Sequence, residues 1–376
     1  MKENQFNLKN GVKSGVGYNK KISSFLYSLF RIWWYLGKFK IWRLFLRFIY
    51  KFVPNRYCVD LLNNIKPDLV FISSINPSDL KLLQQAKRRK LKTVQMIKSW
   101  DNLTSKTFLA TIPDFLIVHN EVMKNEAIVL DDMLREKIFI SGIPQFDYLV
   151  KNREKLEVAR KDFYKKLKIN PNKKVILFCA SGDWLNPYEE EILKDLYYAI
   201  KEGRVIDDVQ IHIRMHPKYQ SNFDEIEKIS EFTMDRPFTY LDKNNFNSWI
   251  FQEEEIEHWY NSIYHSSMVI NTASSISIDA AVLDRPIICI GFDGKEKLSY
   301  EHSVLRFYSR DHYANLIKTK GIDLVKNNDE LIESINKYLK DLDCKKEERK
   351  MLVKQQCYNL DGKSSLRIAD FIKSKL

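Results

Sequence analysis

Hydroxyl-bearing residues follow a short apolar segment in the second half of the chain. The segment Met268 to Asn271 predicts a buried strand, and Thr272, Ser274 and Ser275 stand between it and an expected helix. Hydroxyls and the free backbone N–H groups of a helix N-terminus favour phosphate. Ligands of open parallel sheets bind at the carboxyl ends of the strands. We therefore expect these three residues to contact the phosphates of a nucleotide donor.

Two histidines and an arginine alternate with apolar residues along and beyond another expected strand. His212, Arg214 and His216 should point to the same side, and Pro217 ends the strand. A cation and an imidazole at this edge are placed to stabilise a departing phosphate. A purely structural role fits His212 best and Arg214 least, because an arginine is costly to bury unpaired. No nearby acid or cysteine completes a ligand set, so we expect no metal.

A polar loop in the first half of the chain carries residues suited to binding an acceptor. Asp101 could take a proton from an acceptor hydroxyl, and Trp100 could stack on a sugar face. Lys98 and Lys106 could contact anionic groups, and Asn102 is a further candidate contact. In the alternative interpretation, Asp101 or Asn102 only caps the next helix. Both interpretations stay open at this point.

Several familiar motifs are absent from the chain. It has no G-x-x-x-x-G-K-[ST] loop and no G-x-S-x-G elbow, which argues against a P-loop enzyme or an α/β-hydrolase. The five cysteines are scattered without C-x-x-C pairs, as is typical of buried residues in a reducing, cytosolic setting. They are Cys58, Cys179, Cys289, Cys344 and Cys357. We expect no cofactor.

Two series of alternating strands and helices must position these residues. A chain of 376 residues with 44% hydrophobic content is long enough for two domains. In the first series we expect strands at 68–73, 92–97, 114–119 and 137–141, and helices at 77–90 and 121–134. Gly142-Ile143-Pro144 then turns the chain, and a charged connecting helix is expected from Phe146 to Leu167.

The second series follows the same pattern. We expect strands at 174–180, 209–214, 268–271 and 286–291, and helices at 189–202, 253–264, 277–283 and 329–342. The fold class is therefore α/β, with two Rossmann-like parallel domains at residues 54–150 and 151–376. We expect the first domain to bind the acceptor and the second to bind the donor. A cleft between their strand ends is the expected site.

Residues 1–53 precede both series as a basic, aromatic arm. The arm has eleven Lys or Arg against one acid, Glu3, and so carries most of the net charge of +12. The remainder is nearly neutral, so we expect no binding to nucleic acid. The apolar stretch from Ile22 to Val53 is interrupted by charges and falls short of the roughly 20 apolar residues that a spanning helix needs.

The end of the arm has the pattern of an amphipathic helix. Lys40, Arg43, Arg47 and Lys51 lie within an arc of about 80°, and apolar residues fill the rest of the wheel. This pattern suits a helix in an anionic membrane interface, where each Lys or Arg adds about 1 kcal/mol. The protein would then be cytoplasmic and peripheral at the inner face of the cytoplasmic membrane. The alternative is a helix packed on its own domain, with the basic side chains reaching water.

These residues together resemble a known family. The segments Arg214-x-His216-Pro217, Thr272-Ala273-Ser274-Ser275 with Asp279, and Arg285-Pro286-Ile287 are similar to the CDP-glycerol glycerophosphotransferase-like branch of GT-B glycosyltransferases. The hinge Gly142-x-Pro144-x-x-Asp147 and the segment Asp361-Gly362-Lys363-Ser364-Ser365 with Arg367 also resemble that family.

The resemblance implies a GT-B fold and transfer from a nucleotide-activated donor without a tightly bound metal. It implies a role in the synthesis of surface polymers at the cytoplasmic membrane face. Carried over residue by residue, it makes Arg214, His216, Ser274, Ser275 and Asp279 candidates for donor binding.

Two departures from the family pattern change the expected reaction. The family usually has an acid two residues before the serine pair, where this chain has Thr272-Ala273, and Trp-His-Gly where this chain has Trp100-Asp101-Asn102. The loop instead resembles the Ser-Trp-Asp-Asn-x-Thr-Ser-Lys loops of surface-carbohydrate glycosyltransferases. This resemblance favours sugar transfer with Asp101 as the base and His216 beside the departing phosphate.

We therefore expect an enzyme that moves a sugar from a UDP-, CMP- or CDP-linked donor to a hydroxyl of a glycan or lipid-linked acceptor. The product would be a capsule, O-antigen or teichoic-acid-like polysaccharide. Three alternatives remain open: a CDP-glycerol-type glycerophosphotransferase, a nucleotide-sugar epimerase of the same two-domain fold, and an inactive membrane-bound scaffold.

Overall fold

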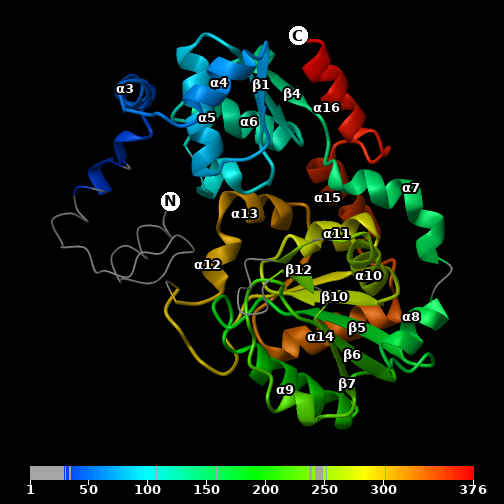
Figure 1. The fold of residues 1–376 in the computed structure, drawn as a ribbon. Coiled ribbons are helices and arrows are strands. Elements are labelled where there is room, and N and C mark those ends of the chain that lie inside the picture. Colours follow the sequence, from blue (N-terminus) through cyan, green and yellow to red (C-terminus); the bar gives the residue numbers. More distant parts are fainter. Residues whose placement is uncertain are drawn as a thin grey trace. The chain divides into compact units, whose positions relative to one another are not determined.

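The chain forms two compact units. The computed structural model describes residues 29, 31–33, 35–106, 108–157, 160–236, 239–241, 249–250, 252–300 and 302–376 (Figure 1). One unit comprises Met1–Tyr148 with Gln355–Leu376, and the other comprises Leu149–Lys354. The expected domain of residues 151–376 is therefore divided, because its last segment belongs to the first unit.

The first unit is built on a four-stranded parallel sheet. Its strands are β1 (Leu69–Ile72), β2 (Lys92–Met96), β3 (Phe115–Val118) and β4 (Ile138–Ile140), paired in that order. The helices α4 (Val59–Ile65), α5 (Pro77–Arg88) and α6 (Glu121–Asp131) connect or precede them. All four strands were expected from their apolar runs. Helix α6 ends earlier than expected, because Asp132 takes a left-handed conformation with φ of 58°.

The carboxyl-terminal helix explains why the last segment joins the first unit. Helix α16 (Ser364–Lys373) contributes Ile368 to a cluster with Val94 and Ile117 of the four-stranded sheet. Phe371 stacks on Phe139 of β4 with their ring centroids 4.3 Å apart. The apolar face of α16 is therefore buried against strands that lie far from this helix in the sequence.

The second unit contains a six-stranded parallel sheet in the order β12-β11-β10-β5-β6-β7. The strands are β5 (Lys174–Cys179), β6 (Val209–Arg214), β7 (Phe232–Asp235), β10 (Met268–Asn271), β11 (Ile287–Ile290) and β12 (Asp323–Val325). The first strand of the unit, β5, lies beside β10, so the strand order reverses between them. Doubly wound sheets bind their ligands at such a reversal.

Two of these six strands were not expected from the sequence. β7 has the mixed sequence Phe-Thr-Met-Asp, and β12 spans only Asp323–Val325. Neither has the continuous apolar run that marked strands of the same length, such as β1 and β4.

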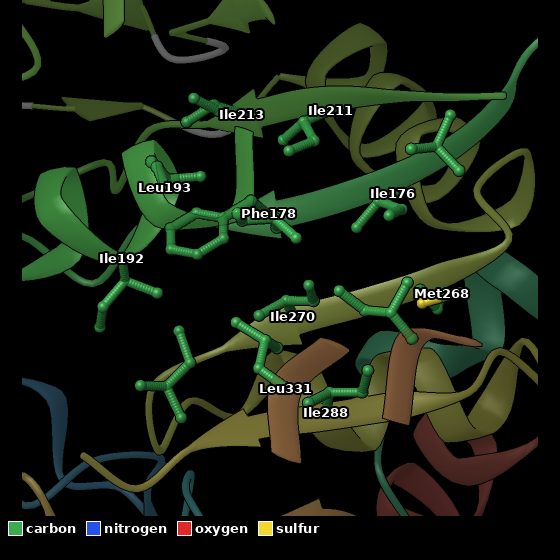
Figure 2. Close-up of a cluster of buried hydrophobic side chains, with 14 of the residues drawn as sticks. Ile176, Phe178, Ile192, Leu193, Ile211, Ile213, Met268, Ile270, Ile288 and Leu331 are labelled. Carbon is green, nitrogen blue, oxygen red and sulfur yellow. The ribbon is translucent and has the colours of Figure 1, made fainter. Parts of the chain in front are cut away.

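The core of the second unit lies between its sheet and two helices. Figure 2 shows Ile176, Phe178, Ile211 and Ile270 of the sheet packed with Leu331 and their neighbours. The helices are α9 (Glu189–Lys201) and α14 (Asn328–Lys340), whereas α10 (Glu253–Tyr264) and α11 (Ile276–Val282) cover the opposite face (Figure 1). The apolar residues of each strand are thus buried on both faces, as expected of a parallel sheet.

The connector between the two sheets is not a single helix. It consists of α7 (Gln145–Glu157) and α8 (Arg160–Lys166), and Asn152 within α7 has non-helical angles. The remaining helices are α12 (Leu305–Tyr308), α13 (Asp311–Lys318) and α15 (Lys346–Cys357), with a π-helix at Asn102–Lys106 and 3-10 turns at Arg135–Lys137 and Ile226–Lys228. Strands β8 (Thr239–Tyr240) and β9 (Trp249–Ile250) form a small antiparallel pair.

The described end of the basic arm is helix α3 (Lys40–Tyr50), which packs on the first unit through its arginines. Arg43 and Arg47 each form an ion pair of 2.6 Å with Asp132. Arg47 also donates to the carbonyl oxygens of Leu109 and Asp131, each at 2.9 Å. The packed-helix alternative placed all four basic side chains in water. Lys40 and Lys51 are exposed, whereas Arg43 and Arg47 face the protein, so the alternative is corrected for the two arginines.

No helix among the described residues is both long and apolar enough to cross a membrane. The expectations for residues 1–28 of the arm lie outside the described part of the chain.

Candidate functional site

The hydroxyl-rich turn lies at the carboxyl end of β10, as expected. Helix α11 begins at Ile276 with Ser275 at the N-cap position. Ser275 is exposed and Ser274 is half-buried. Asn271, the last residue of β10, accepts a hydrogen bond from the backbone N–H of Ser274 at 3.0 Å. Both serines are therefore held at the edge of the sheet where a ligand would bind.

The turn is strained at Ala273 and is supported from below by two buried tyrosines. Ala273 has φ of +44°, a conformation that costs an L-residue about 1–2 kcal/mol. Its backbone N–H donates to the Tyr308 hydroxyl at 3.0 Å, and that hydroxyl donates to Ile290 O at 2.6 Å. The Tyr313 hydroxyl lies 2.9 Å from Ser277 Oγ in α11. Sequence reasoning missed both tyrosines, because neither stands in a motif near the turn.

Thr272 and Asp279 lie beneath this turn and not on its surface. Thr272 is 1% exposed, and its hydroxyl accepts from Asn186 Nδ2 and donates to Glu189 Oε1, each at 3.2 Å. Asp279 is 4% exposed, and its burial raises the pKa of the carboxyl well above the ordinary value. Direct contact of these two side chains with the donor stays a prediction; in this structure both are buried beneath the turn.

Arg214 also lies beneath the surface. It is 4% exposed, and its Nη1 atom is 3.6 Å from Asp235 Oδ2 and 3.5 Å from Ser262 Oγ. His212 lies on the same side, with Nε2 3.6 Å from Asp235 Oδ2, and His258 Nε2 lies 2.7 Å from that oxygen. The expected alternation is thus confirmed for His212 and Arg214. The expected contact of Arg214 with a ligand stays a prediction; in this structure its charge is paired with Asp235 in the interior.

His216 lies beyond the end of β6, in a turn that fixes its tautomer. Its Nδ1 atom accepts hydrogen bonds from the backbone N–H groups of Lys218 and Tyr219, each at 3.0 Å. An Nδ1 atom that accepts carries no proton, so in the neutral ring the proton is on Nε2. Burial lowers the pKa of His216 to about 4, which keeps the ring neutral near pH 7. His216 is therefore arranged to donate a hydrogen bond through Nε2.

The sheet register brings three turns to one edge. In the ladder, Cys179 of β5 is paired with Arg214 of β6 on one side and with Asn271 of β10 on the other. The turns that follow these three residues begin at the same level of the parallel sheet. The turn of His216 and the turn of Ser274 therefore flank the turn after β5, at the point where the strand order reverses.

The polar loop of the first unit is more ordered by its own contacts than expected. Asp101 Oδ2 pairs with Lys106 Nζ at 2.6 Å, and Asp101 Oδ1 accepts from Ser99 Oγ at 2.7 Å. Asn102 is 5% exposed, and its Oδ1 accepts from the backbone N–H of Ser99 at 3.1 Å. Trp100 packs against the core of this unit.

Among the acceptor candidates in this loop, the structure leaves Asp101 half-buried and Lys98 exposed. Asn102 is buried in the loop itself, and its contact with an acceptor stays a prediction. The structure also places Lys106 against Asp101, so that the charge expected to meet an anionic group is already paired.

The two remaining motifs of the resemblance bind each other within the first unit. Asp147 accepts hydrogen bonds from the backbone N–H groups of Ser364 at 3.0 Å and Ser365 at 2.7 Å. Arg367 donates through Nε to Ser141 O at 2.8 Å, and its Nη1 atom donates to both carboxylate oxygens of Asp361 at 2.9 and 2.7 Å. These contacts attach the start of α16 to the hinge, which indicates a structural role for both motifs.

Comparison with solved structures shows the fold. The UDP-GlcNAc 2-epimerase of Neisseria meningitidis bound to UDP-GlcNAc is 14% identical, with a TM-score of 0.56 over 98% of this chain and 88% of that chain. The UDP-GlcNAc 2-epimerase of Methanocaldococcus jannaschii with UDP-GlcNAc and UDP is 15% identical, with a TM-score of 0.52 over 89% and 81%. These similarities confirm the expected two-domain GT-B-like fold.

Comparison with curated proteins gave no match. Residues 80–374, most of the chain, match the model of the family described as CDP-glycerol:poly(glycerophosphate) glycerophosphotransferase. This match includes the polar loop around Asp101 and the turns of His216 and Ser274, and it confirms the expected branch. The chain therefore belongs to the CDP-glycerol:poly(glycerophosphate) glycerophosphotransferase family of transferases.

Proposed function

We propose that this protein is a glycosyltransferase of cell-surface polysaccharide synthesis. In the proposed reaction, a hydroxyl of a glycan or lipid-linked acceptor attacks the sugar of a UDP-, CMP- or CDP-linked donor. The observation that carries the proposal is the edge of the second sheet, where His216 and the serine turn flank the strand reversal. Family membership supports a nucleotide-activated donor, and the loop around Asp101 supports a sugar as the transferred group.

The proposed donor contacts come from the turns and not from the buried residues beneath them. His216 Nε2–H donates to a phosphate oxygen of the departing nucleotide, and the hydroxyls of Ser274 and Ser275 contact the same phosphates. A neutral donor that already points at the phosphate stabilises the charge that grows as the bond to the sugar breaks. Arg214 and Thr272 keep a role in this proposal only as supports of the turns.

The proposed acceptor chemistry belongs to Asp101. A bond forms between the acceptor oxygen and the anomeric carbon, and the bond from that carbon to the phosphate oxygen breaks. The acceptor proton passes to the Asp101 carboxylate, and the nucleotide leaves with the electron pair. Lys98 is exposed beside this loop and is the proposed contact for anionic groups of the acceptor.

Glycerophosphate transfer is the second candidate, and family membership favours it. A panel of UDP-, CMP- and CDP-linked sugars together with CDP-glycerol, assayed by the nucleotide released, separates the two. Nucleotide release from a sugar donor that depends on an acceptor supports the proposal. If CDP-glycerol is the only donor that releases nucleotide, the proposal is overturned. A change in the sugar stereochemistry of the donor without acceptor would indicate an epimerase. Absence of nucleotide binding in calorimetry would indicate an inactive scaffold.

We also propose that helix α3 attaches the protein to the inner face of the cytoplasmic membrane. Because its arginines face the protein, its apolar residues face solvent: Ile41 is 83% exposed and Phe48 57% exposed. Phe52, just beyond the helix, is 69% exposed. Lys40 and Lys51 are also exposed at the two ends of the helix. An exposed apolar face with lysines at its rim fits an anionic lipid surface.

A further inference from the structure

One buried carboxylate joins the ends of two strands at the point where the strand order reverses. Glu189 is the first residue of α9 and is 1% exposed. Its carboxylate accepts from the Ser181 backbone N–H at 2.9 Å and from the Ser181 hydroxyl at 2.7 Å. It also accepts from the Thr272 hydroxyl at 3.2 Å. Ser181 follows β5 and Thr272 follows β10, so a single side chain holds both turns.

The direction of each hydrogen bond is determined by the partners. Asn186 Nδ2 can only donate, so the Thr272 hydroxyl accepts from it and gives its own proton to Glu189. Every described partner of the Glu189 carboxylate is therefore a donor. These donors and the helix dipole favour the ionised form, but burial outweighs them and raises the pKa of Glu189 to about 7, so the carboxylate form predominates only above that pH.

The turn held by Glu189 is in contact with the turn that carries His216. Gly182 follows Ser181 with φ of +87°, and a Cβ atom at Gly182 would overlap Tyr219 Cβ. The Asp183 backbone N–H donates to Gln220 O at 2.8 Å. Tyr219 stacks on the His216 ring, with centroids 4.7 Å apart. Displacement of the turn after β5 would thus be transmitted to His216.

We propose that Glu189 is a positioning residue for the donor site, which holds the turn of His216 and the serine turn in register with each other. It acts through Ser181 on one side and through Thr272 on the other, and it does not touch the donor. The proposal rests on the proposed function, because it takes the two turns as the phosphate contacts. A charge buried for stability alone is a poor choice, since an apolar residue of similar volume often stabilises a fold as well or better.

The test compares the full-length protein with variants that change only these contacts. Glu189→Gln retains the shape but turns an amide NH₂ group toward donors, and Thr272→Val and Ser181→Ala each remove one hydroxyl. Thr272→Ser retains the hydroxyl and is the rescue variant. Glu190→Gln removes the neighbouring carboxylate of the same helical turn and is the control. UDP, CMP and CDP are the probes in calorimetry, and donor KM and kcat are measured below the Tm of every variant.

We expect Glu189→Gln to weaken nucleotide binding and raise donor KM by about tenfold or more, the effect of losing one hydrogen bond to a charged group. Thr272→Val and Ser181→Ala should show smaller losses, whereas Thr272→Ser and Glu190→Gln should bind as the unchanged protein does. A purely structural residue would lower the Tm but leave the affinity of the folded protein intact, and that result overturns the proposal. If Glu189→Gln does not fold, unchanged affinity in both hydroxyl variants overturns it.

The behaviour of the unchanged protein distinguishes failure of the proposed function from failure of the positioning role of Glu189. If it binds none of the three nucleotides, the proposed function fails, and the role of Glu189 in a donor site fails with it. If it binds a nucleotide and transfers a sugar while Glu189→Gln is indistinguishable from it, only the positioning role fails.

Discussion

The guanidinium group of Arg47 lies inside the protein, with its Nη1 atom 2.6 Å from Asp132 Oδ2. Arg43 reaches the same carboxylate from one turn earlier in α3. The two arginines of this amphipathic helix therefore pack on the protein and the apolar side faces outward. The ordinary arrangement of a surface helix is inverted.

Replacing Asp132 by Asn tests whether this ion pair holds α3 in place. Asp132 has φ of 58°, and Asn adopts this conformation readily, so Asp132→Asn removes the charge without adding backbone strain. Without this carboxylate, Arg43 loses its paired anion and buried Arg47 keeps only Asp131 of its described anions, 3.8 Å away, so the free energy of unfolding should fall by roughly 3 kcal/mol. Urea denaturation measures this loss. A loss below about 0.5 kcal/mol, the size of an ordinary surface substitution, would contradict the packing of α3 on Asp132.

The exposed face of α3 should determine binding to lipid. Combined replacement Ile41→Asp and Phe48→Asp should abolish co-sedimentation with vesicles that contain anionic lipid, because charged groups replace the apolar side chains that would enter the interface. Lys40→Gln with Lys51→Gln should leave weaker binding that depends less on salt. Leu366→Asp changes a 56% exposed leucine of α16 and is the control. Undiminished sedimentation of the Ile41 and Phe48 double variant would remove α3 as the membrane contact.

The orientation of α3 on the protein could not be predicted from the sequence. Periodicity correctly placed Arg43 and Arg47 on one side of a helix, but it contains no information on which side packs against the protein. That depended on Asp132, which lies 85 residues beyond Arg47. The central strands were predicted because each is a continuous apolar run, and the turn of Ser274 was predicted because it directly follows one.

The supports of the candidate site could not be predicted in the same way. Glu189 contacts Thr272 across 83 residues, and Tyr308 contacts Ala273 across 35. Such contacts depend on the strand order of the finished sheet. The sequence indicated chemistry for Arg214 and Thr272, whereas the fold buries both. Residues with suitable groups at a strand end can thus support a site without facing its ligand.

The tautomer of His216 leads to a prediction about transfer activity. His216→Asn provides a carbonyl oxygen for the two backbone N–H groups but removes the Nε2–H donor. The kcat should fall by about 10²–10³, the effect of removing one donor that stabilises a developing negative charge. Because the pKa of His216 is about 4, its protonation should limit activity only near that pH and not near 6.5. A kcat close to that of the unchanged enzyme would exclude His216 from the phosphate.

Replacing Asp101 tests its proposed role as the base, and replacing Lys106, its ion-pair partner, is the control. Asp101→Asn still accepts from Ser99 but cannot take a proton, so kcat should fall by about 10²–10⁴. Lys106→Gln breaks the pair with Asp101, but Lys106 is 56% exposed, so stability should change by less than about 1 kcal/mol. Single-turnover kinetics with a saturating donor measure the chemical step. If Asp101→Asn retains full kcat while His216→Asn does not, the base is another group.

The burial of Glu189 should appear in the pH dependence of stability. Burial raises the pKa of Glu189 from 4.5 to about 7, so the folded state holds a proton that the unfolded state has lost between these values. The stabilisation from this group is complete below pH 4.5 and is lost as the pH rises to about 7, by roughly 3 kcal/mol in total. Glu189→Gln cannot titrate.

The measurement is urea denaturation of both proteins at intervals from pH 4.5 to 8. Asp131 and Asp279 also have raised pKa values and contribute to the slope of both proteins, so only the difference between the two curves reports Glu189. That difference should change steadily up to about pH 7 and then become constant. Parallel curves throughout would mean that Glu189 has the same pKa in the folded and unfolded chain, and the buried carboxylate between Ser181 and Thr272 would have to be rejected.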